Sequence, residues 1–214
     1  MHSLTLASGA PRAPHTRHVI WLPGAFQKAA DFVSAGFHRA VAQRRLPLDL
    51  TFVDLEMAHL QDREPLRELH NDIVLPLQQQ GADVWLGGIS LGALFALDYA
   101  DRHGGLLSGM CLLAPYLGNR TLIAEIMAAP GLAAWQPGEL AENDEERRIW
   151  RYLKGRGAGS PPLYVGLARG DRFAPSQRLL AETLPPGAIM ETDGDHDWRS
   201  YSALWEIFLD LKHV

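Results

Sequence analysis

The chain alternates short apolar runs with longer segments whose apolar residues recur at helical spacing. We expect strands at residues 18–22, 48–55, 84–89, 109–114, 163–168 and 189–192. We expect helices at residues 29–45, 63–80, 91–103, 176–183 and 198–212, with an interruption at Pro76 in the second of them. Strands separated by helices predict right-handed crossovers and a parallel sheet. The pattern therefore predicts a three-layer α/β/α sandwich with a mostly parallel sheet of about six to seven strands.

Two segments depart from this alternation. Residues 1–17 contain prolines and scattered histidines but no apolar core of signal-peptide length, so we expect a flexible N-terminal arm before a single domain at 18–214. Residues 116–160 are too long for a simple crossover between two strands. They predict a small helical cap inserted over the active site. The alternative is an excursion at the edge of the sheet, far from the chemistry.

Composition narrows the class of protein. The 214 residues are 47% hydrophobic and 21% charged, which is typical of a globular domain. A net charge of −5 gives no basic surface for nucleic acid, and no apolar stretch approaches the 18 residues of a membrane span. The single cysteine, Cys111, excludes an internal disulfide framework and favours a cytoplasmic location. Since Cys111 lies in an apolar run, we expect a buried, inert thiol. A homodimer is left open.

Ser90 is the first candidate for chemistry. It lies in Gly88-Ile89-Ser90-Leu91-Gly92, between a predicted buried strand and a predicted helix. A nucleophile held on a sharp strand-to-helix turn needs small neighbours, because the flanking backbone comes close. The alternative is a glycine-rich turn whose serine only caps the next helix. The strand before Ser90 and the helix after it favour the nucleophile.

A serine hydroxyl needs a base to take its proton and an acid to orient that base. Asp171 follows the strand at 163–168, and His196 lies between the last predicted strand and the last helix. The carboxyl ends of parallel strands meet at one edge of a sheet, where ligands bind. We therefore predict Asp171 as the acid and His196 as the base, with Asp195 as the alternative acid.

The acidic residues around His196 also raise the question of a metal. Asp193, Asp195 and Asp197 alternate as in calcium loops, but the full loop with its closing glutamate is missing. We favour helix capping, or tuning of His196, for Asp195 or Asp197. No metal and no cofactor are expected.

The developing negative charge on a substrate carbonyl oxygen needs two backbone N–H donors. Leu91, directly after the nucleophile, should supply one of them. The loop after the first predicted strand should supply the other, and we choose Ala25 because Gly24 permits a close backbone approach.

Three motifs together resemble the α/β-hydrolase fold. They are Gly-x-Ser-x-Gly at 88–92, Gly-Asp-x-Phe-x-Pro at 170–175 and Gly-x-His-x-Trp at 194–198, and the resemblance runs from about residue 18 to the C-terminus. It implies Ser90 as nucleophile, Asp171 as acid, His196 as base, and the N–H groups of Ala25 and Leu91 as the oxyanion hole.

The resemblance implies a carboxylesterase-like serine hydrolase that acts on a small-molecule acyl substrate. The same three residues would also serve a thioesterase or an acyltransferase, and a noncatalytic binding protein on a hydrolase scaffold is a further alternative. The chain departs from many relatives in two places, with Pro23 where they have histidine before the glycine and Asp195 where they have glycine. Aromatic residues that would line a substrate pocket, or equally belong to the core, are Phe26, Trp135, Trp150 and Trp198.

Overall fold

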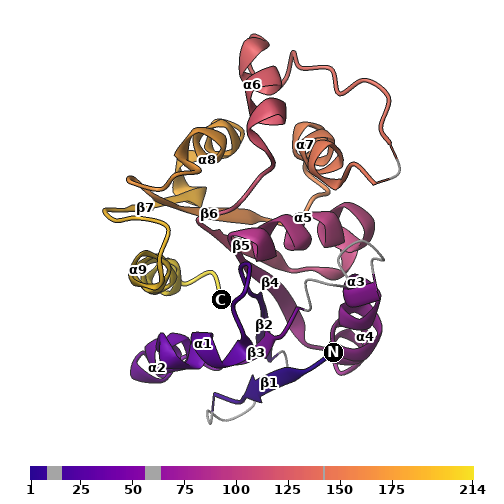
Figure 1. The fold of residues 1–214 in the computed structure, drawn as a ribbon. Coiled ribbons are helices and arrows are strands. Elements are labelled where there is room, and N and C mark those ends of the chain that lie inside the picture. The colour runs from indigo at the N-terminus through magenta and orange to yellow at the C-terminus, as the bar shows by residue number, and fades with distance from the viewer. Residues whose placement is uncertain (9–15, 56–63, 142) are drawn as a thin grey trace.

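The computed structural model describes residues 1–8, 16–55, 64–141 and 143–214, and its centre is one seven-stranded sheet (Figure 1). The strand order is β1-β3-β2-β4-β5-β6-β7. The strands are β1 (Ser3–Leu6), β2 (Arg17–Leu22), β3 (Leu48–Val53), β4 (Asp83–Ile89), β5 (Gly109–Leu113), β6 (Leu163–Ala168) and β7 (Ile189–Thr192). All neighbouring strands pair in parallel except β1, which is antiparallel to β3. The predicted α/β/α architecture is confirmed.

Helices cover both faces of the sheet (Figure 1). On one face lie α1 (Ala29–Ser34), α2 (Phe37–Gln43) and α9 (Trp198–Asp210). On the other lie α3 (Glu64–Glu68), the π-helical segment Leu69–Val74, α4 (Leu75–Gln79), α5 (Leu91–His103), α6 (Arg120–Ala128), α7 (Glu145–Gly155) and α8 (Ala174–Ala181). Short 3₁₀ turns occupy Gly104–Leu106 and Pro186–Ala188. Strand β2 shows how period-2 alternation serves both layers, because Val19 and Trp21 join one core and Ile20 and Leu22 the other.

Strand β1 corrects the expectation of a flexible arm. Ser3–Leu6 pairs with the end of β3, and the hydroxyls of Thr5 and Thr51 lie 2.8 Å apart. A four-residue strand at the edge of a sheet, mostly exposed, carries too little hydrophobic pattern to be recognised in the sequence. Residues 9–15 of the expected arm lie outside the described residues.

Two predicted helices differ from a single regular α-helix: one is interrupted, and the other is not interrupted at Pro76 as predicted but changes its winding before it. The segment 29–45 breaks at Gly36, whose φ of 87° cannot continue a right-handed helix, so α1 and α2 are separate. The segment 63–80 continues through Pro76, but as α3, a π-helical stretch and α4; residue 63 lies outside the described residues. The wider π turns directly precede Pro76, whose ring and missing N–H do not fit a regular α-helical ladder.

The segment predicted as a cap, residues 116–160, contains the helices α6 and α7 and is called the cap below; its placement over the active site stays a prediction. Helix α6 begins at the side chain of Asn119, which accepts hydrogen bonds from two of its first N–H groups. Helix α7 packs along α5 and buries Ile149, Trp150 and Leu153 in the core shared with the sheet. No helix in the described part of the chain has the length and apolar character needed to cross a membrane.

Candidate active site

Ser90 lies on a strained turn between β4 and α5. Its φ of 50° and ψ of −115° place it in a region that side chains rarely adopt. A Cβ at Gly88 would lie 2.6 Å from the backbone of Ala93, and one at Gly92 would overlap the carbonyl oxygen of Leu22. Only glycine fits at these two positions, which explains why the motif carries them.

Backbone hydrogen bonds hold this turn on every side. The N–H of Ser90 donates to the carbonyl of Leu113 at 3.1 Å. Its own carbonyl accepts from the N–H groups of Ala93 at 3.1 Å and Tyr116 at 3.0 Å. The surrounding structure therefore over-determines a conformation that would be unfavourable by itself.

The structure brings Ser90, His196 and Asp171 together from three strand ends. The Oγ of Ser90 lies 2.8 Å from Nε2 of His196, and Nδ1 of His196 lies 2.8 Å from Oδ2 of Asp171. An ionised carboxylate only accepts hydrogen bonds, so Nδ1 carries the proton and Nε2 is left to accept from the serine hydroxyl. This is the arrangement in which an imidazole acts as a base toward a hydroxyl.

The surroundings of Asp171 favour its ionised form, although its side chain is fully buried. Burial alone raises the pKa of its carboxyl, but hydrogen bonds from His196, Gln177 and the N–H of Phe173 outweigh that effect and hold the pKa below its ordinary value. The amide of Gln177 donates to Oδ2 at 2.8 Å, and the Phe173 N–H donates to Oδ1 at 2.8 Å. Asp171 is therefore a fixed negative charge facing the imidazole.

Two aromatic rings hold the imidazole of His196 from its sides. Phe173 and Tyr201 contact it nearly perpendicularly, with ring centroids at 5.0 and 5.4 Å. Sequence reasoning missed Tyr201 and Gln177 as members of this site. Phe173 had a signal, since it lies inside the motif that contains Asp171.

The predicted oxyanion donors are the N–H of Leu91, at the start of α5 directly after the nucleophile, and the N–H of Ala25, in the loop after β2. Among the hydrogen bonds of the described residues, none has the N–H of Leu91 or Ala25 as its donor. The N–H of Gly24 is instead taken by the side chain of Gln27 at 2.8 Å. A Cβ at Gly24 would lie 3.3 Å from the Cβ of Ser90, so this loop passes directly beside the nucleophile.

Comparison with known proteins identifies the fold. Neither a family model nor a curated protein matches the sequence. Solved structures do match, among them the monoacylglycerol lipase of Paleococcus ferrophilus, with 17% identity and a TM-score of 0.63 over 100% of both chains. The fluorophosphonate-binding serine hydrolase F of Staphylococcus aureus matches with 12% identity and a TM-score of 0.64 over 100% of this chain and 99% of that one. The chain has the α/β-hydrolase fold.

The chain is also similar in structure to a further hydrolase. The S-formylglutathione hydrolase of Staphylococcus aureus shares 13% identity and a TM-score of 0.61, over 95% of this chain and 84% of that chain. At such identities the comparison gives the α/β-hydrolase fold, and the chemistry must be argued from the site.

The two tryptophans of the cap lie in its packing. Trp150 is fully buried and donates from Nε1 to the carbonyl of Leu117 at 2.6 Å. Trp135 is 3% exposed and donates to Glu125 at 2.8 Å. Neither lines the cavity described below, so the structure does not bring them to the site as pocket residues.

The other two predicted pocket residues lie on the opposite side, toward α1 and α9. Phe26, in the loop after β2, is 90% exposed and has a φ of 63°. Trp198 packs edge-on against the rings of Phe32, Phe37 and Tyr201. Tyr201 in turn contacts the imidazole of His196. Trp198 therefore packs against a residue that holds His196 in place, and it does not line the cavity described below.

Two of the acidic residues around His196, Asp193 and Asp197, make different contacts with their neighbours. Asp193 forms an ion pair with Arg169 at 2.8 Å, and Asp197 caps α9 by accepting from the N–H of Ser200 at 2.9 Å. The capping prediction for Asp197 is confirmed. Asp195 is exposed, and the imidazole is hydrogen-bonded to Asp171.

Cys111 is buried in β5, and burial raises the pKa of its thiol. This agrees with the expected inert thiol.

Within the described ranges, no three His, Cys, Asp or Glu side chains are grouped as metal ligands.

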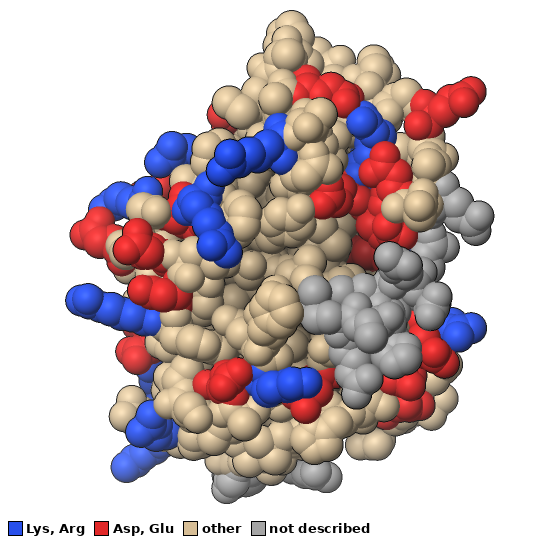
Figure 2. Space-filling view, viewed as in Figure 1, with Lys and Arg blue, Asp and Glu red and all other residues tan. Residues whose placement is uncertain are grey.

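A cavity of about 470 Å³ lies on the β5 and β6 side of the triad; its lining holds no triad residue but includes two residues that contact the triad. It begins at Tyr116, whose N–H is bonded to Ser90, and at Phe173, whose ring lies against His196. One side of α6, from Arg120 to Met127, and the start of α8 form its other walls. In Figure 2 the surface is hollowed between α6 and α8, with basic side chains along the α8 side and acidic ones toward α7.

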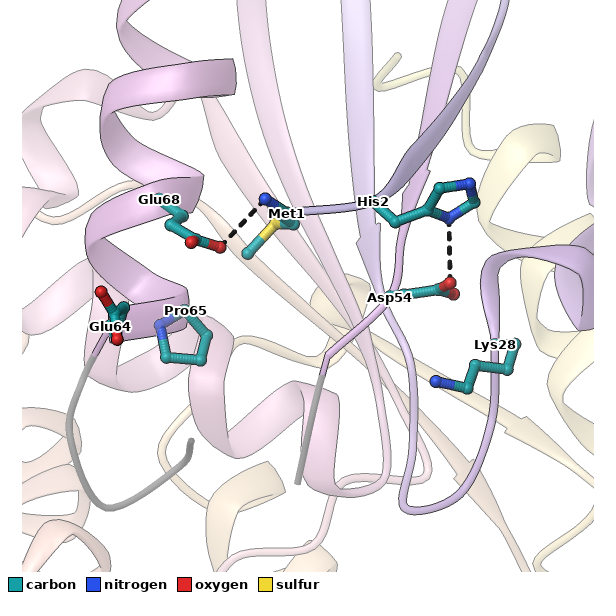
Figure 3. A pocket seen from close by; sticks show the side chains of 7 residues that line it. All are labelled: Met1, His2, Lys28, Asp54, Glu64, Pro65 and Glu68. Atoms are coloured by element: carbon teal, nitrogen blue, oxygen red, sulfur yellow. Dashed lines mark hydrogen bonds and ion pairs between the residues drawn. The ribbon is translucent and has the colours of Figure 1, made fainter. Parts of the chain in front are cut away.

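A second cavity, of about 380 Å³, lies between β1 and α3 (Figure 3). The amino group of Met1 is paired with Glu68 at 3.0 Å, and His2 with Asp54 at 2.9 Å. Its described lining includes neither a triad residue nor, unlike the first cavity, a residue shown in contact with the triad, so we assign it no part in the chemistry at Ser90.

Proposed function

We propose that this chain is a serine hydrolase that cleaves a carboxylic ester of a small molecule through an acyl-enzyme on Ser90. The observation that carries the proposal is the pair of 2.8 Å contacts from Ser90 to His196 and from His196 to Asp171. The printed names of two structural neighbours, a monoacylglycerol lipase and a serine hydrolase, support it. A noncatalytic binding protein would have no need of a serine held in strained backbone beside a base.

The reaction follows from the roles of these groups. The Oγ of Ser90 attacks the ester carbonyl carbon while its proton moves to Nε2 of His196. The N–H groups of Ala25 and Leu91 stabilise the resulting oxyanion. The C–O bond to the alcohol then breaks, and His196 returns its proton to the leaving oxygen. Water, deprotonated by His196, attacks the acyl carbon, and the carboxylic acid leaves while Ser90 regains its proton.

The direct test is covalent labelling with a fluorophosphonate, which reacts with activated serines. We expect one adduct, on Ser90 by peptide mapping, and none in the Ser90→Ala variant. A folded protein that stays unlabelled at Ser90 would contradict the proposal.

Turnover supplies the second arm of the test. Short p-nitrophenyl esters should be hydrolysed by the wild type, with a loss on the order of 10⁶-fold in kcat for Ser90→Ala, as for removal of other serine nucleophiles. Adding an alcohol as acceptor distinguishes hydrolysis from acyl transfer, because a transferase would form a new ester in place of the free acid.

A further inference from the structure

The cavity between α6 and α8 is partly apolar, and two of its lining residues, Tyr116 and Phe173, contact Ser90 and His196. Ile123 and Met127 of α6 face Phe173 and Pro175 across it, and Met127 is 57% exposed. A partly apolar cavity of this size, one residue away from a nucleophile, suits one side of a small ester. Because it lies on the β5 side of Ser90, opposite the Ala25 loop on the β2 side, a substrate could occupy it without blocking the oxyanion donors.

Two arginines add charge to this lining. Arg120 begins α6 and Arg172 follows Asp171, and both are exposed at the cavity. Among the described residues neither is in an ion pair, whereas Arg147 and Arg169 are each paired with two carboxylates. Arg172 lies over the ring of Phe173, with its guanidinium carbon 4.9 Å from the ring centroid. Both guanidinium groups can therefore meet an anion that enters the cavity.

Acidic side chains do not cancel this charge from within the lining. The described lining residues include no Asp or Glu. Glu146 lies just outside the lining and keeps its negative charge there: its carboxylate accepts from the hydroxyl of Tyr116 at 2.6 Å and from the side-chain amide of Asn119 at 2.6 Å, and among the described residues no ion pair joins it to Arg120 or Arg172. Figure 2 shows the same polarity, with blue side chains arching along the α8 side of the hollow.

We infer that the preferred substrate is an aliphatic ester that carries a carboxylate on the part held in this cavity, with Arg120 and Arg172 as the residues that select it. The inference rests on the proposed function, since it names the substrate class of that same site. The apolar walls would hold the methylene chain and the two guanidinium groups its terminal carboxylate.

Matched esters test this preference. On the acyl side, the monomethyl ester of a six-carbon dicarboxylic acid is compared with the methyl ester of its monoamide, which has the same size and no charge. On the alcohol side, the acetate ester of 4-hydroxybutyrate is compared with that of 4-hydroxybutanamide. We expect kcat/KM to favour the carboxylate in one of the two arms by about tenfold, as two partly screened charge pairs would give. The arm that responds identifies which part of the ester enters the cavity.

The variants ask whether the two arginines are responsible. Replacing both, as Arg120→Gln with Arg172→Gln, should bring the carboxylate-to-amide ratio of kcat/KM close to one. Arg178→Gln is the matched control, because it removes the same charge from an exposed position of α8 outside the cavity lining and should leave the ratio unchanged. Added salt should lower the wild-type ratio.

Equal turnover of carboxylate and amide in both arms, with Ser90 labelled and neutral esters hydrolysed, would overturn the substrate inference and leave the proposed function standing. A ratio that survives in the double variant would also overturn it. No labelling of Ser90 and no hydrolysis of any ester would remove the proposed function and this inference with it.

Discussion

The turn at Ser90 and the cap at 116–160 are built in opposite ways. At the turn, backbone geometry decides everything: Gly88 and Gly92 leave no room for a Cβ, and hydrogen bonds fix the strained serine. In the cap, side chains decide: Trp150 bonds to a backbone carbonyl, and Arg147 bridges helices α6 and α7 through Glu125 at 2.6 Å. A single added methyl group at the turn should therefore lower stability and activity, whereas the cap should tolerate side-chain substitutions that keep its packing.

The largest difference should come from removing a negative charge in each region. Asp171→Asn keeps the size of the side chain but favours the wrong tautomer of His196, so we expect kcat to fall on the order of 10⁴-fold. Asp144→Asn in the cap is the control, because asparagine also caps a helix well and should leave kcat within about twofold. Steady-state kinetics on a neutral ester measures both. Near-normal turnover in Asp171→Asn would move the acid role to Asp195.

Adding one methyl group to a glycine separates the two regions next. The new Cβ in Gly92→Ala would overlap the carbonyl of Leu22 and shift the start of α5, so we expect a loss of about 1–3 kcal/mol in unfolding free energy. If the N–H of Leu91 moves with it, kcat should fall by about 10²-fold, as for loss of one oxyanion donor.

Gly155→Ala at the end of α7 is the matched change in the cap. No atom outside its immediate neighbours lies within 4 Å of the new Cβ, so stability should be unchanged or slightly raised. Denaturant unfolding and kinetics on the two variants give the comparison. A Gly92→Ala protein as stable and active as Gly155→Ala would show that the turn is not constrained as we describe.

The same contrast explains what could be predicted from the sequence. Strand ends, the turn and the triad leave local marks in the sequence, because a Cβ at Gly88, Gly92 or Gly170 would come within 3 Å of backbone atoms. Gln177 left no such mark: a glutamine in an amphipathic helix is usually a surface residue, and its contact with Asp171 exists only in three dimensions. Tyr201 is hidden for the same reason, inside a helix pattern that predicts only core.

The cap was predicted as helical, but the sequence left open whether its aromatic residues line a pocket or belong to the core. Helical spacing shows that Trp135 and Trp150 face something apolar, and it cannot distinguish a substrate cavity from a packed interior. The missed break at Gly36 and the missed strand β1 have a related cause. A single glycine is tolerated in many helices, so Gly36 does not by itself predict a break. A four-residue edge strand is ordered mainly by pairing with its neighbour, which the local sequence does not reveal.

Tryptophan exchanges should have a smaller effect, mainly on stability. Trp150→Phe keeps most of the ring but leaves the buried carbonyl of Leu117 without its donor, which we expect to cost about 1–3 kcal/mol. Trp135→Phe should cost less, because its partner Glu125 is 40% exposed and water can replace the indole N–H. Thermal or denaturant unfolding measures both. A loss of kcat beyond about tenfold in Trp150→Phe would mean that the cap sets the geometry of the triad.

The smallest expected difference is in the response to acid. The pKa of Asp171 is held low by hydrogen bonds that outweigh burial, and the pKa of Glu125 is lowered mainly by its hydrogen bond to Arg147. A carboxyl whose pKa is lower in the folded state stabilises that state above its unfolded pKa, near 4, and loses this contribution as the pH falls through the lower folded value. Both groups should therefore contribute at neutral pH and less in acid.

The two contributions should nevertheless differ, because Asp171 is buried and Glu125 is screened by water and salt. We expect the stability difference between wild type and Asp171→Asn to shrink from pH 6 to pH 3, while the difference for Glu125→Gln stays small and nearly flat, more so at high salt. Denaturant unfolding across this range measures both. A difference for Asp171→Asn that does not change with pH would mean that its carboxyl is not ionised beside the imidazole, which would undercut its proposed role in orienting His196.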